Sequence, residues 1–129
     1  TAAVADFRPS QPSSNKIKKR DDGGLTLELV QNPDILAQVA AHAERPFVVG
    51  FAAETHDVTH YAREKLERKR LDMIAANRVG QEGSGFDADA NALSVFWPGG
   101  GCEIGMASKA EVARQLLATI AQRLQERAG

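Results

Sequence analysis

Basic side chains at two places in this sequence could bind an anion such as phosphate. The first place is the run K-I-K-K-R at residues 16–20, which follows a segment with two prolines and precedes Gly23-Gly24. This arrangement is consistent with a hinged flap that carries an ammonium over an anionic ligand, although a charged run is more often a solvated loop. The second place is Lys65 and Lys69, which are four residues apart and would share one helix face. They could hold phosphate, or they could belong to a surface helix with nearby glutamates as partners.

Polar residues also follow four predicted strands. Asp6 follows the first, Asn32-Pro33-Asp34 the second, Glu54-Thr55 the third and Asn77 the fourth. In parallel sheets the ligand crevice lies beyond the carboxyl ends of the strands. Loops are polar in general, so one such position means little, but four together favour a binding site on that edge.

Other residue patterns predict no additional chemistry. His56 and His60 have a spacing that can bind zinc, but no third ligand is evident nearby, so we expect surface residues. Cys102 lies in a predicted hairpin and is expected to be a packed thiol. The sequence has no G-x-G-x-x-G, no Walker A and no G-x-S-x-G motif.

The elements that would position these residues alternate between strand and helix. We predict a strand at 1–5, a loop at 7–15, a strand at 25–29, a helix from Asn32 to about 43, a strand at 47–51, a helix at 58–70 capped by Asp57, a strand at 71–76, a loop at 78–91, a hairpin over 93–104 and a helix opened by a capping box at Ser108. The alternation over residues 25–77 predicts right-handed βαβ units and a mostly parallel sheet.

Composition limits the function classes. The chain has 129 residues, 16 basic and 17 acidic, and a net charge of −1. Such a balance gives no electrostatic bias towards nucleic acid or a membrane surface, and no apolar run approaches the length of a membrane span. One cysteine and no signal-like start favour a cytoplasmic protein. The chain opens on Thr1 and an apolar run without Met, so we expect a domain truncated at its N-terminus.

Several short motifs occur together in one order. They are A-D-F-R-P at 5–9, K-I-K-K at 16–19, N-P-D-I at 32–35, G-F-A-A-E-T at 50–55, A-N at 76–77 and N-A-L at 91–93. In this combination the sequence closely resembles the phosphopantothenoylcysteine synthetase domain of bacterial bifunctional coenzyme A biosynthesis proteins, over nearly the whole chain. The resemblance implies a three-layer αβα Rossmann-like fold with a mostly parallel sheet and a β-hairpin, acting as a homodimer.

The resemblance also implies a reaction. The family joins 4'-phosphopantothenate to L-cysteine with CTP and Mg²⁺. The pantothenate carboxylate attacks the α-phosphate of CTP, which gives an acyl-cytidylate and pyrophosphate. The cysteine amine then attacks the acyl carbon, and CMP leaves. FMN would serve only a decarboxylase domain that this chain lacks.

Site residues follow from the same resemblance. Lys16 matches the flap lysine that is important for forming the acyl-cytidylate, and Thr1 and Ala2 lie where strand-end backbone contacts the nucleotide. The side chains or segments that match the CTP site are Asp6, Lys16, Asn32, Pro33, Asp34, Ile35, Phe51, Lys65 and Lys69. The metal ligands are unknown. All these groups should converge on one rim of the sheet.

The chain is thus expected to be the C-terminal part of one synthetase domain, with four segments. These are a strand end and basic flap at 1–24, the nucleotide region at 25–77, a loop and hairpin at 78–107 and a C-terminal helix at 108–129. The family's glycine-rich turn and acyl-cytidylate asparagine are absent, so we expect weak CTP binding and no turnover by this chain alone. The alternatives are a non-catalytic nucleotide-binding or dimerisation module, and a different nucleotide enzyme such as a dehydrogenase. We favour the hairpin around Trp97 as the dimer contact.

Overall fold

The computed structural model describes residues 4–18, 24–79 and 89–128. The chain divides into two compact units, Thr1–Ile35 and Leu36–Gly129, which are described separately below. The predicted strand residues 1–3, part of the basic run (19–20), the glycine at 23 and most of the predicted loop at 78–91 lie outside the described residues.

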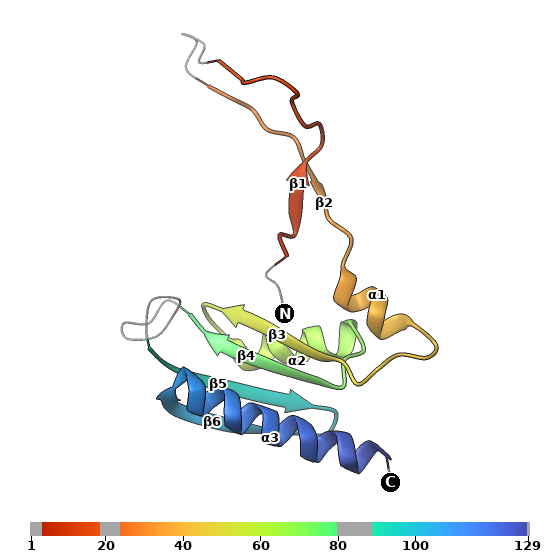
Figure 1. Ribbon diagram of the computed structural model, residues 1–129, viewed down its shortest axis with the longest axis vertical. Helices are drawn as coiled ribbons and strands as arrows, with labels where there is room; N and C mark the ends of the chain where they lie inside the picture. The colour runs from red at the N-terminus through yellow and green to blue at the C-terminus, as the bar shows by residue number, and fades with distance from the viewer. Residues whose placement is uncertain (1–3, 19–23, 80–88, 129) are drawn as a thin grey trace. The chain divides into compact units, whose positions relative to one another are not determined.

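The first unit is built on a two-stranded antiparallel ribbon. Strand β1 (Phe7–Pro9) pairs with β2 (Leu29–Gln31) in the register Phe7↔Gln31 to Pro9↔Leu29 (Figure 1). The prediction of a loop over 7–15 is wrong for β1, because a proline is compatible with the end of a strand that is paired on one side only. The predicted strand at 25–29 is displaced, since only Leu29 of that range is in β2.

The second unit contains a four-stranded sheet in the order β3-β4-β5-β6. Its elements are α1 (Ile35–Ala41, of which Ile35 belongs to the first unit), β3 (Val49–Glu54), α2 (Val58–Arg68), β4 (Met73–Arg78), β5 (Ala90–Trp97), β6 (Gly100–Ser108) and α3 (Lys109–Ala128). β3 and β4 are parallel, whereas β4–β5 and β5–β6 are antiparallel. The sheet is therefore mixed, and its parallel share is smaller than expected because the early strands lie in the ribbon.

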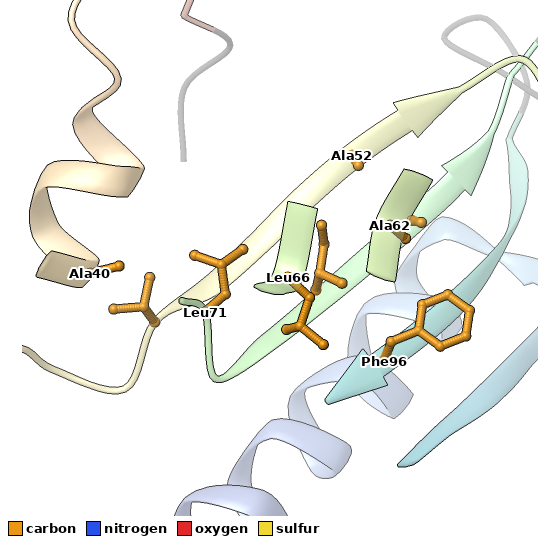
Figure 2. Close-up of a cluster of buried hydrophobic side chains, with 9 residues drawn as sticks. Ala40, Ala52, Ala62, Leu66, Leu71 and Phe96 are labelled. Carbon is orange, nitrogen blue, oxygen red and sulfur yellow. The ribbon is translucent and has the colours of Figure 1, made fainter. Parts of the chain in front are cut away.

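Each face of this sheet has its own hydrophobic core, which confirms the three-layer αβα class. On one face, Ala62 and Leu66 of α2 and Ala40 of α1 pack with Ile74 and other strand residues (Figure 2). On the opposite face, α3 packs through Val112 onto a cluster that includes Met73 and Val95. Alternation along β3 assigns its residues to the two faces: Gly50, Ala52 and Glu54 face α2, while Val49, Phe51 and Ala53 face the side of α3.

Several local signals appear as predicted. Ser108 Oγ accepts a hydrogen bond from the Glu111 N–H at 3.3 Å, so the side chain caps α3. Gly99 turns the β5–β6 hairpin with a φ of +81°, a conformation that favours glycine. The prediction that Asp57 caps α2 is wrong for its side chain, which makes no capping bond because the backbone of Asp57 is left-handed, with φ 44°. No helix in the described ranges is long and apolar enough to cross a membrane.

An ion-pair cluster closes the end of the sheet where β3 begins. The Asp72 carboxylate accepts hydrogen bonds from the Val48 N–H at 2.7 Å, from Arg45 at 2.9 Å and from Arg127 at 3.1 Å. Arg45 also donates to the carbonyl of Arg70 at 2.8 Å. These bonds join the turn before β4 to the start of β3 and to the end of α3, so they hold the sheet that carries the candidate site.

Candidate functional site

In the first unit, Asp6 and Asn32 lie together at the base of the ribbon. The Asn32 N–H donates to the Asp6 carbonyl at 2.8 Å, and Asn32 Nδ2 donates to the Ala5 carbonyl at 2.6 Å. Arg8 donates from Nη1 to Asn32 Oδ1 at 3.0 Å and to the Gln31 carbonyl at 3.2 Å. The expectation that Asn32 begins the helix is wrong, because its side chain is engaged across the ribbon and α1 begins at Ile35.

These bonds give Asn32 a structural role in the site. The hydrogen bonds of Asn32 to the carbonyls of Ala5 and Asp6 hold the segment 32–34 next to the segment around Asp6. Two predicted site segments are therefore adjacent. Both Asp34 and Ile35 are exposed at the start of α1. Arg8 was missed as a contributor, although the motif A-D-F-R-P contains it, because its spacing from Asn32 carries no sequence signal.

Lys16 lies in the segment between β1 and the undescribed residues 19–23. The residue is exposed and belongs to neither a helix nor a strand. Asp6 and Lys16 are in the first unit, whereas Phe51, Lys65 and Lys69 are in the second. The convergence of all these groups on one rim therefore stays a prediction.

In the second unit, Phe51 and Asn77 occupy one face of the parallel strands β3 and β4, with Asn77 near the carboxyl end of β4. Phe51 pairs in register with Ala75, and Ala53 pairs with Asn77, so the four residues lie on the same face. The Phe51 side chain is exposed, at 59%, although it is large and apolar. Asn77 is buried, and its Oδ1 has no hydrogen-bond partner in the described part of the chain.

A buried side-chain oxygen without a hydrogen-bond partner is unusual in a folded protein. Most buried polar atoms are hydrogen-bonded, and an unsatisfied one costs about 1–3 kcal/mol. An exposed aromatic ring offers a flat surface for stacking. Asn77 was noted in the sequence as a polar residue after a strand, but its burial depends on the neighbouring strands and could not be predicted.

Lys65 and Lys69 lie on the opposite face, towards α2. Lys65 Nζ lies 2.5 Å from Glu54 Oε1 at the end of β3. The partner of Lys65 is therefore a strand residue, whereas the helix glutamate Glu64 pairs with Arg68. Lys69 follows the last residue of α2 and is half-buried. Phe51 and Lys65 thus lie on opposite faces near the end of β3, and a ligand that contacts both must cross the carboxyl edge of the sheet.

The histidines after β3 are engaged in local contacts. His56 Nδ1 lies 3.0 Å from Thr55 Oγ1, and His56 Nε2 lies 3.4 Å from the Tyr61 hydroxyl. His60 packs edge-on against the ring of Tyr61. Within the ranges that the structure describes, no group of three His, Cys, Asp or Glu side chains is placed to hold a metal ion.

Comparison with known proteins identifies relatives that match along most of this chain. A relative from Vibrio cholerae, named coenzyme A biosynthesis bifunctional protein CoaBC, is 52% identical over 125 residues, which are 95% of this chain and 31% of the relative. The protein of that name from Escherichia coli K12 is 47% identical over 129 residues, 98% of this chain and 32% of the relative. The chain therefore spans about a third of the length of these relatives.

Solved structures give the same picture for the fold. The crystal structure of the C-terminal domain of CoaBC matches with a TM-score of 0.71 and 31% identity, over 97% of this chain and 53% of that one. The DNA/pantothenate metabolism flavoprotein from Streptococcus pneumoniae matches with a TM-score of 0.69 and 25% identity, over 93% of this chain and 60% of that one. Both similarities confirm the Rossmann-like α/β class.

The family model described as "DNA/pantothenate metabolism flavoprotein C-terminal domain" matches residues 1–124. That match covers nearly the whole chain and agrees with the resemblance drawn from the motifs at 5–9, 16–19 and 50–55. The chain belongs to the family of DNA/pantothenate metabolism flavoprotein C-terminal domains.

Proposed function

We propose that this chain carries the nucleotide-handling part of a CTP-dependent phosphopantothenate–cysteine ligase in coenzyme A biosynthesis. Two observations support this most directly: the exposed ring of Phe51 on β3, and the unsatisfied amide oxygen of Asn77 on the same face of the neighbouring strand β4. A cytosine ring can stack on an aromatic side chain, and its amino group can donate to a free amide oxygen. The names of the relatives place them in the same biosynthesis.

The reaction requires two anions to meet. The carboxylate of 4'-phosphopantothenate forms a bond to the α-phosphorus of CTP, and the bond to pyrophosphate breaks. The amine of L-cysteine then forms an amide bond with the acyl carbon, loses a proton, and CMP leaves. A protein accelerates such steps mainly by positioning the reactants and neutralising their charge.

The cationic side chains suit that task. In this proposal Lys16 neutralises the charge that develops when the carboxylate attacks, while Lys65 and Lys69 hold the phosphates. Asp6 and the segment from Asn32 to Ile35 would contact the nucleotide from the first unit. Because Asn32 already joins these two segments, a nucleotide would meet a preformed surface there.

Magnesium fits this site as a companion of the triphosphate. Mg²⁺ keeps several waters and is commonly held by one or two carboxylates together with substrate phosphates. A site of that kind needs no cluster of protein ligands, and the described residues form none. When bound, the ion would neutralise charge on the triphosphate, while the protein supplies the lysines.

The complete protein would differ from this chain in its domains and its activity. FMN would belong to a decarboxylase domain beyond the sequence described, in agreement with the word "bifunctional" in the names of the relatives. We also propose a homodimer, with the β5–β6 hairpin as the contact. We expect this chain by itself to bind CTP weakly and not to turn over.

Nucleotide preference tests the proposal. CTP with Mg²⁺ should raise the melting temperature of the protein more than ATP, UTP or NAD does. Indifference to nucleotide identity would instead support a non-catalytic dimerisation module, and a preference for NAD would support a dehydrogenase.

The variant Lys16→Gln tests the role of the flap. In the complete native protein it should abolish formation of the acyl-cytidylate, measured as pyrophosphate release that depends on phosphopantothenate, while the melting temperature stays the same. Lys18→Gln is the matched control, because Lys18 is exposed in the same segment. Normal pyrophosphate release by Lys16→Gln would refute the role.

A further inference from the structure

The ion pair between Glu54 and Lys65 has a position that sets it apart from a surface salt bridge. It joins the last residue of β3 to the third turn of α2, and the Nζ–Oε1 distance is 2.5 Å. The Glu54 side chain is only 15% exposed and the Lys65 side chain 34%. By contrast, the pair of Arg68 with Glu64 lies within α2, spans 3.6 Å and is exposed.

The geometry of the βα unit explains how the two groups meet. Side chains on a helix lean towards its N-terminus, which here is the end next to the carboxyl edge of β3. Lys65 therefore extends back along α2 to the end of the strand. Glu54 is held firmly, since its carbonyl accepts the Val79 N–H at 2.9 Å and its backbone pairs in register with β4.

A carboxylate at this place would by itself oppose the proposed function, because it would repel a triphosphate. However, a lysine ammonium has three N–H donors, and one carboxylate oxygen needs only one of them. The remaining two donors can serve phosphate oxygens at the edge of the sheet. The lysine stem is long and flexible, so a fixed partner reduces the number of positions that the ammonium samples.

We propose that Glu54 is a positioning residue that holds the Lys65 ammonium at the carboxyl edge of the sheet for a phosphate group of the nucleotide. This inference rests on the proposed function for the presence of a nucleoside triphosphate. It assigns Glu54 an effect that is exerted through Lys65, and the sign of that effect depends on whether Lys65 is present.

The test is a double-mutant cycle in the complete native protein, with dissociation constants measured by calorimetry. Two probes are used, CTP with Mg²⁺ and inorganic tripolyphosphate, since the pair would act on phosphates rather than on the base. Glu54→Gln should weaken binding about tenfold, because the ammonium is no longer held. In the Lys65→Met background the same change should tighten binding about fivefold, because it removes a carboxylate that is then unpaired and repels the phosphates.

Two more variants separate positioning from charge and from folding. Glu54→Asp keeps the charge but withdraws the carboxylate by one methylene, so it should also weaken binding. Glu64→Gln removes the same charge from the outer side of α2 and should change binding less than about twofold. Melting temperatures measured for all variants confirm that each is folded.

Each result decides something. Opposite signs in the two backgrounds support the inference. Tighter binding by the single variant Glu54→Gln would mean that Glu54 competes with the phosphates. Additive effects of the Glu54 and Lys65 substitutions on the binding free energy would mean that Glu54 does not act through Lys65. Either result would overturn the inference while leaving the proposed function intact. Opposite signs with tripolyphosphate but no preference for CTP would refute the proposed function alone. If the unmodified protein binds neither probe, both fail.

Discussion

Replacement of Asn77 by valine should make this protein more stable and, under the proposed function, less able to bind CTP. The Asn77 amide oxygen is buried without a partner in the described part of the chain, which costs about 1–3 kcal/mol. Valine is similar in size, carries no polar atom and favours strands. We therefore expect Asn77→Val to raise the free energy of unfolding by about 1 kcal/mol, at the lower end of that range.

Urea unfolding followed by circular dichroism measures this gain. With a slope of roughly 1–3 kcal/mol per M, the midpoint should rise by about 0.3–1 M. In the presence of CTP, the unmodified protein should instead be more stable than Asn77→Val. At CTP concentrations about 100 times the dissociation constant, the unmodified protein gains about 2.7 kcal/mol, whereas the variant gains much less because it has lost an acceptor for the base.

A matched control is available on the neighbouring strand. Asn91 Oδ1 accepts the Ala92 N–H at 2.9 Å, so its amide oxygen is satisfied. Asn91→Val should therefore lower the free energy of unfolding by about 1 kcal/mol, the opposite sign. If Asn77→Val is destabilised by a similar amount, or if it keeps the full stabilisation by CTP, the argument from the unsatisfied oxygen is wrong.

Two other predictions concern the scaffold that holds the site. Asp72→Ala should lower the free energy of unfolding by about 3 kcal/mol, because the buried Val48 N–H and two arginines lose their acceptor. Urea titration measures this loss, and a value below about 1 kcal/mol would contradict the prediction. Gly50→Ala should lower the free energy of unfolding by about 1–3 kcal/mol, because the new Cβ would lie 2.7 Å from Cδ1 of the buried Leu71. Gly105→Ala is the control, because a Cβ there meets open space. Equal losses of stability in the two variants would disprove the packing argument.

Local patterns were predictable where one short segment determines the outcome. The helix cap at Ser108, the hairpin turn at Gly99 and the order of elements from β2 to β4 follow from neighbouring residues. The partner of β2 could not be predicted from neighbouring residues, because an amphipathic strand can pair with any open sheet edge. Asn32 illustrates the same limit: its type suits a helix cap, but a closer partner across the ribbon engages its side chain.

Family membership was determined by the sequence alone, since the order of motifs from A-D-F-R-P to G-F-A-A-E-T is specific before any folding is considered. Tertiary structure alone decided which of these residues meet. The burial of the Asn77 oxygen requires strands on both sides of it, and the contact of Lys65 with Glu54 requires α2 to fold back along β3. Burial and long-range pairing are properties of the assembled sheet, so no spacing along the chain encodes them.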